Sequence, residues 1–407
     1  MNCRSCNSST ENKEFINLGT SPPSNAFINL GQLEQAEIHY PLKVIVCQNC
    51  WLVQTQDFVK KEELFSSEYD YHSSFSSSFL KHAEDYVGMM ISRFHLDKKS
   101  FVIEVASNDG YLLQNFKNNE INHIGIEPTL SSAKIAEQKG IKTINEFFGE
   151  NLANKLKEQG FSPDLMVANN VLAHVPDIND FLKGFRILIK QDGIITFEFP
   201  HLVSLVSNNQ FDTIYHEHFS YISLTALNIM LKRNNLEVFD VEEITVHGGS
   251  LRVFCQLLNG PKAITNNVKN ILNKETILGL NNLKYYTQFQ DKAIKIKDEF
   301  LEFLINNRHK KIVGYGAAAK GNTLMNYAGV KSDYIEYIVD RNPSKINKFT
   351  PGSRIPIVSE DFLLETKPNF IIVFPWNLID EIKSQLYYVK EWDCKLVTFI
   401  PTTQIHG

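Results

Sequence analysis

The sequence lacks a long hydrophobic run, since no stretch approaches the ~20 apolar residues that a membrane-spanning helix needs. The N-terminal segment MNCRSCNSST also lacks the apolar core of a signal peptide, so we expect a cytoplasmic protein. Lys and Arg are scattered and the net charge is −5, which leaves no basic face for a phosphate backbone. We therefore expect neither a membrane nor a nucleic acid as a partner.

Cysteine is scarce: of six residues, four form two C-x-x-C pairs, while Cys255 and Cys394 lie in apolar strand patterns and are expected to be buried thiols. The four are Cys3, Cys6, Cys47 and Cys50. Two such pairs can present four thiolates to one zinc ion, because the two-residue gap lets both sulfurs of a pair turn toward it. The alternatives are two disulfides, which a cytoplasmic redox state disfavours, or four unrelated thiols. Four cysteine ligands leave no open position, so we expect a structural Zn2+ that holds a small N-terminal domain together.

The length of 407 residues exceeds one ordinary core and predicts three domains, which we place at 1–75, 76–260 and 261–407. The first is turn-rich and carries the cysteine pairs. From residue 76 onward, apolar runs alternate with amphipathic stretches, which is the pattern of a parallel sheet covered by helices. The predicted fold class is α/β.

Seven apolar runs define the sheet of the central domain. They lie at residues 101–106, 123–127, 142–145, 164–169, 193–199, 236–244 and 250–258. Helical crossovers separate the first five, whereas only the turn HGG separates the last two, which predicts an antiparallel hairpin. Five parallel strands and a hairpin favour a class I (Rossmann-like) S-adenosylmethionine methyltransferase sheet over a dinucleotide-binding sheet, which normally continues with another crossover helix.

A second alternation of strands and helices follows a long helical pattern that ends near Arg308. Its apolar runs lie at 312–317, 334–339, 369–374 and 395–400. They predict a smaller Rossmann-like domain at the C-terminus. Its first strand leads into GYGAAAKG, a loop that opens a helix and could contact phosphate. A structural turn is the alternative, because Ala319 stands where the G-x-G-x-x-G pattern has its third glycine.

Small and acidic side chains follow the first strand of the central domain. The candidate cofactor residues there are Glu104, Ala106, Ser107, Asn108, Asp109 and Gly110. Small residues let the backbone approach a ligand, and the two acids favour a cationic sulfonium and amino group over phosphate. The other candidates, at the ends of the second and fourth strands, are Glu127, Pro128, Asn169 and Asn170. Glu127 is placed to accept hydrogen bonds from ribose hydroxyls, although each residue alone could be a turn former or helix cap.

The segment YHEHFSYIS, which starts at Tyr215, is too polar for a core strand. Its two histidines, His216 and His218, could bind a metal together with a third ligand that the sequence does not identify. Acid–base chemistry is the second interpretation, because a histidine titrates near neutrality, the neighbouring Glu217 can orient it, and a tyrosine can donate to a developing oxyanion. A polar loop with satisfied histidines is the third. His174, after the fourth strand, could face the same pocket or be a packed core residue.

Together these motifs resemble the sugar C-methyltransferase family, especially the nucleotide-linked deoxysugar 3-C-methyltransferases. The resemblance covers essentially the whole chain and is carried, in order, by the cysteine pairs, SNDG, NNVLAHVPD, YHEHFSYIS, HGGSLRV, GYGAAAKGNTLMN and PWN. It implies a substrate such as a thymidine-diphosphate 4-keto-6-deoxyhexose, methylated at the carbon beside the ketone. The catalytic residues that it implies are His218 as the base, Glu217, Tyr215, His174 and Tyr69.

The substrate contacts that we assign to these motifs are Tyr71, His247, Arg252, Lys320, Asn322, Trp376 and Asn377; the motif leaves open which of Tyr69 and Tyr71 faces the site. Ala106 departs from the family, whose loop usually has glycine there, and alanine fits without strain only if its φ is not positive. In the implied reaction a base removes the proton beside the ketone, and the carbon of the enolate attacks the sulfonium methyl.

Three other functions stay open. An O-methyltransferase of a nucleotide sugar would use the same cofactor and a similar base. A zinc-containing NAD-dependent oxidoreductase is prompted by the GYGAAAKG loop, and a pure binding protein would carry a degenerate cofactor site. The expected partner is the nucleotide-sugar substrate, and the expected state is a monomer or a small homo-oligomer.

Overall fold

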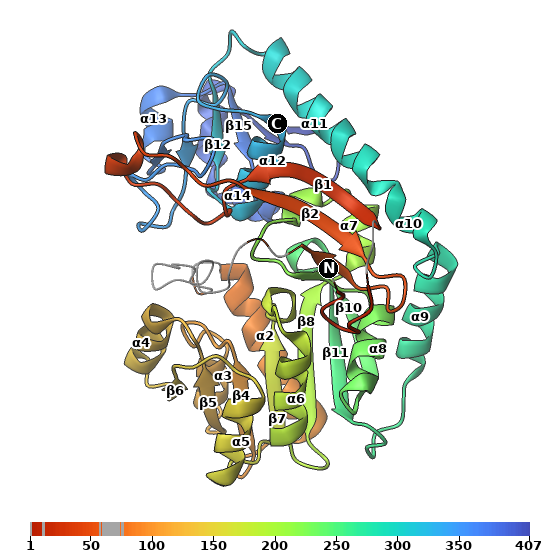
Figure 1. Ribbon diagram of the computed structural model, residues 1–407. Coiled ribbons are helices and arrows are strands. Elements are labelled where there is room, and N and C mark those ends of the chain that lie inside the picture. The colour runs from red at the N-terminus through yellow and green to blue at the C-terminus, as the bar shows by residue number, and fades with distance from the viewer. Residues whose placement is uncertain (1, 10–12, 57, 59–73, 75–76) are drawn as a thin grey trace.

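The computed structural model describes residues 2–9, 13–56, 58, 74 and 77–407, and three β-sheets form its framework (Figure 1). Tyr69 and Tyr71 lie outside the described residues. Figure 1 shows the C-terminal sheet above the central sheet, with strands β1 and β2 of the N-terminal sheet between them. Within the described ranges, a helix with the length and hydropathy of a membrane span is absent.

The central sheet has seven strands in the order β10-β11-β8-β7-β4-β5-β6. Their bounds are β4 (Phe101–Val105), β5 (Asn122–Ile126), β6 (Thr143–Ile144), β7 (Leu165–Asn169), β8 (Ile194–Pro200), β10 (Leu236–Ile244) and β11 (Ser250–Leu257). Strands β4 to β8 pair in parallel with one another, and β11 pairs antiparallel with both β10 and β8. The seven predicted strands and the hairpin are confirmed. The carboxyl ends of β4, β5 and β7 therefore meet at one edge, where open α/β sheets bind ligands.

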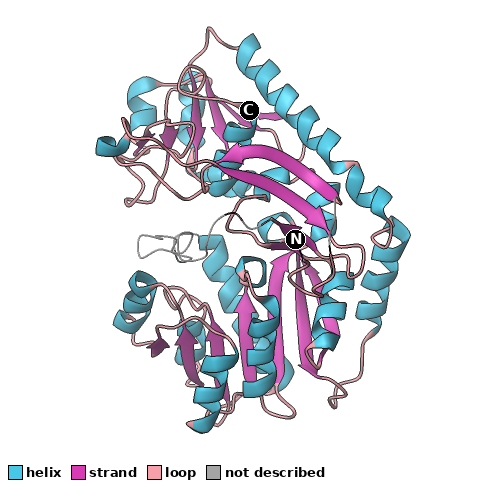
Figure 2. Cartoon of the chain, in the orientation of Figure 1, coloured by secondary structure: helices cyan, strands magenta, loops and turns pink. Residues whose placement is uncertain are grey.

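Helices cover this sheet (Figure 2), and its inner strands β4, β7, β8 and β11 are buried on both faces. The helices are α2 (Ser77–Phe94), α3 (Leu113–Asn118), α4 (Leu130–Gln138), α5 (Glu150–Glu158), α6 (Ile178–Leu188), α7 (Leu202–Ser207) and α8 (Leu224–Arg233). Successive side chains of a strand point to opposite faces, so Leu165 and Val167 of β7 pack with α2 and α3, and Met166 and Ala168 with α5 and α6. This double burial explains the near-continuous apolar runs of the sequence.

The N-terminal sheet takes one strand from the central segment. Its strands are β1 (Glu14–Ser21), β2 (Tyr40–Val46), β3 (Val53–Thr55) and β9 (Ser220–Tyr221), all paired antiparallel in this order. The two-residue strand β9 belongs to the histidine-rich segment YHEHFSYIS (residues 215–223), which the sequence analysis judged too polar for a core strand. Both residues of β9 are buried, so that judgement was wrong for this part of the segment. Thr55 at the end of β3 also donates its hydroxyl hydrogen to the carbonyl oxygen of His218, at 2.5 Å. The N-terminal part therefore packs directly against the histidine-rich segment.

The N-terminal sheet completes its core with two helices that lead into the C-terminal domain, α10 (Leu283–Thr287) and α11 (Phe289–Asn306). The preceding helix α9 (Asn266–Leu278) packs instead on α8 and β10 of the central domain. The ring of Phe15 on β1 stacks on that of Phe289, with centroids 4.8 Å apart, and the ring of Trp51 stacks on that of Tyr286 at 6.0 Å. A domain with little core of its own is thus stabilised by burying its apolar face against another part of the chain.

The C-terminal domain is the predicted Rossmann-like unit, with strand order β14-β13-β12-β15-β16-β17. Its strands are β12 (Ile312–Tyr315), β13 (Ile338–Val339), β14 (Ile357–Val358), β15 (Phe370–Val373), β16 (Lys395–Thr398) and β17 (Gln404–His406); its helices are α12 (Ala319–Ala328), α13 (Phe362–Thr366) and α14 (Ile379–Gln385). All neighbours pair in parallel except β16 and β17. The sequence did not predict β14 and β17. The domain limits at 1–75, 76–260 and 261–407 stay a prediction.

Candidate active site

The four paired cysteines converge on one point. Their sulfur atoms all lie within 4.8 Å of one another, and the Sγ atoms are 3.5 Å apart both between Cys3 and Cys50 and between Cys6 and Cys47. Zinc–sulfur bonds of ~2.3 Å in a tetrahedron place the sulfurs ~3.8 Å apart, so the set fits one zinc ion. None of the four is in a disulfide.

The cysteine cluster is the only group of three or more suitable side chains in the described parts of the chain that could hold a metal. His216 and His218 are therefore not part of a described metal site, and the ring of His216 instead lies edge-on to Tyr40, with centroids 6.1 Å apart. Cys255 and Cys394 are buried free thiols, as predicted.

The predicted cofactor loop and the end of β5 hold a buried acidic cluster of Glu104, Asp109 and Glu127. Burial, followed by the charges of Glu127 and Asp109, raises the pKa of Glu104 well above its usual range. Burial also raises the pKa of Glu127. The Lys139 ammonium lies 2.9 Å from Asp109 Oδ2 and offsets one of the three carboxylates. A cationic ligand would stabilise the remaining negative charge.

Several buried polar atoms around these acids have no hydrogen-bond partner within the described residues. They are Glu104 Oε2, Ser107 Oγ, Asp109 Oδ1, Asn169 Oδ1 and both amide atoms of Asn170. An unpaired buried polar atom costs about 1–3 kcal/mol, so a cluster of them indicates a polar ligand. Glu127 accepts the backbone N–H groups of Asn108 and Thr129 at 2.9 and 2.8 Å, and Asn145 holds the carbonyl oxygens of Glu127 and Pro128. These residues fit S-adenosylmethionine, whose sulfonium and amino groups are cationic.

The backbone of this loop corrects one expectation. Ala106 has φ +55°, so the condition for a strain-free alanine is not met. Asn108 at φ +50° and Gly110 at φ +76° are also left-handed, and a Cβ on Gly110 would lie 3.1 Å from the side chain of Ile141. Strained backbone at a ligand site persists where the surrounding structure fixes it, and here β4, β5 and α3 do so.

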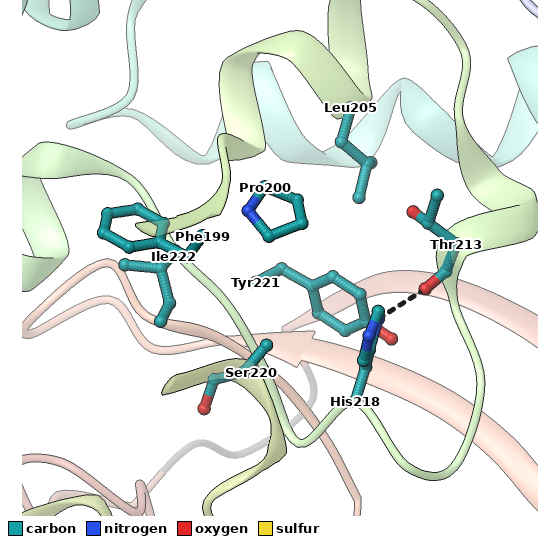
Figure 3. A pocket seen from close by; sticks show the side chains of 9 residues that line it. Phe199, Pro200, Leu205, Thr213, His218, Ser220, Tyr221 and Ile222 are labelled. Atoms are coloured by element: carbon teal, nitrogen blue, oxygen red, sulfur yellow. Dashed lines mark hydrogen bonds between the residues drawn. The ribbon is translucent and has the colours of Figure 1, made fainter. Parts of the chain in front are cut away.

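The ring of His218 is held by hydrogen bonds at both nitrogens. Its Nδ1 lies 2.8 Å from the carbonyl oxygen of Thr213, and its Nε2 lies 2.8 Å from the hydroxyl of Tyr215 (Figure 3 shows the Thr213 contact). A carbonyl oxygen only accepts, so Nδ1 carries the proton and Nε2 is the basic nitrogen that accepts from Tyr215. Burial, and then the charge of His174, holds the pKa of His218 well below its usual range. The ring is therefore neutral near pH 7.

A small pocket opens beside His218 (Figure 3). It is lined by Ala173, Phe199, Pro200, Leu205, Thr213, His218, Ser220, Tyr221 and Ile222. His174 lies edge-on to His218, with ring centroids 4.6 Å apart, and its Nδ1 donates to the carbonyl oxygen of Glu217 at 2.9 Å. Burial lowers the pKa of His174 to about 4, so this ring is also neutral near pH 7.

The Glu217 carboxylate does not contact the ring of His218 through a hydrogen bond. Its Oε1 accepts the backbone N–H of Asn25 at 3.2 Å and the side-chain amide of Asn25 at 3.0 Å. Its Oε2 is buried and has no partner within the described residues. The carbonyl of Thr213, rather than the side chain of Glu217, thus orients His218. The sequence offered no signal for Thr213 or Asn25, because both contacts arise from tertiary folding.

Three predicted residues of the C-terminal domain meet near this site. Lys320 Nζ lies 2.7 Å from Asn377 Oδ1 and 4.3 Å from the ring centroid of Trp376. The indole N–H of Trp376 donates to Asp212 Oδ2 at 2.7 Å. Burial lowers the pKa of Lys320 to about 8, and burial raises the pKa of Asp212 to about 6. Asp212 is a further residue that the sequence analysis missed.

His247 lies on the turn between β10 and β11 with φ +55°, and burial followed by the charge of Lys320 lowers its pKa to about 4. The turn packs against Trp376, because a Cβ on Gly248 would lie 2.4 Å from the Trp376 ring. His247 therefore joins the group around Lys320, and the assignment of these residues to the substrate stays a prediction.

Arg252 and Asn322 already have protein partners. The Arg252 guanidinium lies 2.5 Å from Glu198 Oε1, which also ties the buried Glu198 carboxylate to β11. The Asn322 amide donates to the carbonyl oxygen of Ser24 at 2.7 Å, so this residue connects the C-terminal domain with the N-terminal part. These contacts favour a structural role for both residues, and their assignment to substrate stays a prediction.

The backbone of the GYGAAAKG loop is hydrogen-bonded to the carboxylate of Asp340. The backbone N–H of Ala317 donates to Asp340 Oδ2 at 2.8 Å, and Lys345 donates to the carbonyl oxygen of Ala317 at 2.9 Å. An anion bound to the loop in this way disfavours a phosphate at the same place. The geometry therefore gives no support to the dinucleotide site of an oxidoreductase.

Comparison with known proteins finds a relative along most of the chain. C-methyltransferase NovU of Streptomyces niveus is 30% identical over 371 residues, which are 91% of this chain and 88% of the relative. The chain belongs to the C-methyltransferase family. Three family models match this C-methyltransferase: a zinc binding domain at residues 3–65, a methyltransferase domain at 79–241 and a C-methyltransferase C-terminal domain at 245–401.

Solved structures resemble parts of the C-methyltransferase more distantly. Magnesium protoporphyrin IX methyltransferase of Synechocystis PCC 6803 is 11% identical, with 49% of this chain and 99% of that chain covered and a TM-score of 0.36. The PH0226 protein of Pyrococcus horikoshii is 14% identical, with 49% and 100% covered and a TM-score of 0.37. The family models and the cysteine geometry show that the C-methyltransferase uses S-adenosylmethionine and holds zinc.

We expect the substitution Glu127→Ala to weaken S-adenosylmethionine binding by about 1.5–3 kcal/mol, the loss of a charged hydrogen bond. Calorimetric titration measures this, with Glu146→Ala as the control. Glu146 is an exposed acid whose carboxylate lies 3.5 Å from Lys155, so its removal should leave the affinity unchanged. Equal affinity of Glu127→Ala and wild type would show that Glu127 does not hold the ribose.

Proposed function

We propose that this C-methyltransferase methylates C3 of a nucleotide-linked 4-keto-6-deoxyhexose, with thymidine diphosphate as the carrier, in deoxysugar biosynthesis. The observation that carries the proposal is the neutral His218, whose basic Nε2 accepts a hydrogen bond from the Tyr215 hydroxyl. A carbon beside a ketone becomes nucleophilic only after it loses a proton, because the charge can then move to the carbonyl oxygen. The pair supplies both the base and the oxyanion donor that this step needs.

The reaction divides into two steps at this site. In the first, His218 Nε2 takes the proton from C3 while the Tyr215 hydroxyl moves its hydrogen bond to the sugar carbonyl oxygen, which becomes the enolate oxygen. Thr213 keeps Nδ1 protonated and stabilises the imidazolium. S-adenosylmethionine supplies an electrophilic methyl group when bound. The enolate carbon C3 is then the nucleophile that this methyl group would meet in the second step, with the cofactor held by the loop at Glu104, Asp109 and Glu127, and His218 returns its proton to solvent.

We place Lys320 against the negative charge of the substrate, with His247, Trp376 and Asn377 beside it. Its ammonium group is expected to be charged below a pH of about 8 and neutral above it. The titratable groups that face it are Asp212, His218 and His247. Substrate affinity should therefore fall as the pH rises through about 8, because the cation is lost.

This pH dependence is measured as kcat/KM from pH 6 to 10. Lys320→Arg should move the alkaline limb upward, since arginine keeps its charge. Lys320→Met should lower kcat/KM about tenfold to hundredfold at pH 7 and remove the limb. An unchanged alkaline limb in Lys320→Met would show that another group titrates there.

The proposed function is tested by incubating the protein and S-adenosylmethionine with matched pairs of nucleotide sugars, one carrying a 4-keto group and one a 4-hydroxyl group. Release of S-adenosylhomocysteine reports turnover. We expect turnover of the keto sugars alone, because only they can form an enolate. Turnover of the hydroxyl sugars would instead support O-methylation.

A further inference from the structure

A turn of the N-terminal part reaches the histidine-rich segment at Glu217. The backbone N–H and the side-chain amide of Asn25 both donate to Glu217 Oε1, at 3.2 and 3.0 Å. Both partners come from distant parts of the chain, since 192 residues separate them. Glu217 is buried, and its Oε2 has no hydrogen-bond partner in the described ranges of the chain.

The turn that carries Asn25 is itself fixed from the C-terminal domain. Asn322 of α12 donates to the carbonyl oxygen of Ser24 at 2.7 Å. Three residues after Asn25, the backbone N–H of Ile28 donates to the carbonyl oxygen of Phe349 at 2.9 Å. The backbone N–H of Phe349 donates in turn to the carbonyl oxygen of Ile28 at 2.8 Å. Two anchors therefore hold the turn, so Asn25 is presented to Glu217 in a defined position.

We propose that Asn25 is a positioning residue for the reaction: it fixes the Glu217 carboxylate so that Oε2 accepts a hydrogen bond from a hydroxyl of the bound sugar. This inference rests on the proposed function, because it requires a hydroxylated substrate beside His218. A buried carboxylate oxygen without a partner is costly in the free protein, and a substrate hydroxyl would satisfy it. The cysteine-containing N-terminal part thereby contributes to substrate binding as well as to the fold.

The charge state of Glu217 supports the same role. Burial raises the pKa of Glu217, whereas hydrogen bonds from its own backbone, from the side chain and backbone of Asn25 and from the backbone of Ser24 lower it. Only the ionised carboxylate is an acceptor at both oxygens, so Asn25 favours the form that binds a hydroxyl. Removing the side-chain donor should shift the pKa of Glu217 upward, and placing a second carboxylate there should shift it further.

The test compares Asn25→Ala and Asn25→Asp with wild type and with the control Asn17→Ala, which changes an exposed asparagine of the nearby strand β1. We expect Asn25→Asp to lower kcat/KM about tenfold to hundredfold and Asn25→Ala to lower it less, with zinc content and S-adenosylmethionine affinity unchanged. The acid limb of kcat/KM should move to higher pH in both variants, and further in Asn25→Asp. Asn17→Ala should match wild type throughout.

A double-mutant cycle with Glu217→Gln decides whether Asn25 acts through Glu217. Asn25→Ala should cause no further loss in the Glu217→Gln background. An equal loss in both backgrounds, an unmoved acid limb, or loss of zinc from the Asn25 variants would each overturn the proposal. The cycle works with any acceptor that wild type methylates, so turnover of a different acceptor would count against the proposed function alone.

Discussion

Replacement of His218 by asparagine is expected to reduce methyl transfer by about 10²- to 10⁴-fold, the contribution of a positioned general base. The asparagine amide can still donate to the carbonyl of Thr213, so the local fold should survive while the basic nitrogen is lost. The keto sugar should also exchange the hydrogen at C3 with solvent more slowly on the variant. Turnover is measured with saturating cofactor, and exchange by NMR in deuterated water.

Two controls separate the loss of the base from a loss of cofactor binding or of the oxyanion donor. S-adenosylmethionine affinity should be near that of wild type, because His218 lies outside the acidic cluster of the cofactor loop. Tyr215→Phe should lower turnover as well, since it removes the proposed oxyanion donor but leaves the base. Full turnover of His218→Asn would reject His218 as the base and make Tyr215 or His174 the next candidate. Persistent exchange without methylation would assign His218 to positioning.

Removal of zinc is expected to have the largest effect on stability. Structural zinc contributes roughly 10–16 kcal/mol of apparent binding free energy in small zinc-binding peptides, which is comparable to the stability of a whole domain. Without the ion, the four cysteine side chains, whose sulfur atoms lie within 4.8 Å of one another, would have no common ligand to hold the start of the N-terminal sheet in place. We expect chelation to unfold this region and to abolish methyl transfer, because strand β3 and Asn25 contact the histidine-rich segment.

The matched variants are Cys50→Ser, which removes a ligand, and Cys394→Ala, which removes a buried thiol far along the chain. Metal analysis should find about one zinc per chain in wild type and Cys394→Ala, and much less in Cys50→Ser. Hydrogen exchange should show loss of protection at β1 to β3 in Cys50→Ser alone. A zinc-free protein with full activity and protection would contradict this account of the cysteines.

The sequence predicted the sheets well where burial on both faces leaves a long apolar run. The run at 164–169 became β7 at Leu165–Asn169, and the run at 250–258 became β11 at Ser250–Leu257. Strands β9 and β14 have only two residues each, and their pairing depends on partners far along the chain. The two-residue strands β6 and β13 were found because each lies in a longer run that the sequence shows, at 142–145 and 334–339. No such run surrounds β9 and β14, so sequence reasoning could not find them.

The sequence predicted those site residues whose type and spacing identify their chemistry. It did not predict backbone angles or contacts between residues that are far apart in the chain. The cysteine spacing specified a zinc cluster that the structure confirms. The identity of Ala106 did not reveal its φ, which turned out to be positive. Asp212, Thr213 and Asn25 hold Trp376, His218 and Glu217, yet each stands in an unremarkable sequence context. Contacts between distant segments form only on folding, and they complete the site.

Transfer of a 13C-labelled methyl group from S-adenosylmethionine to a nucleotide-linked 4-keto-6-deoxyhexose tests the central claim most directly. NMR of the product locates the label through its coupling to the sugar carbons. The account predicts that the labelled methyl is bonded directly to C3, and that His218→Asn forms almost none of this product. A label that resides in a methyl ether on a sugar oxygen would contradict it.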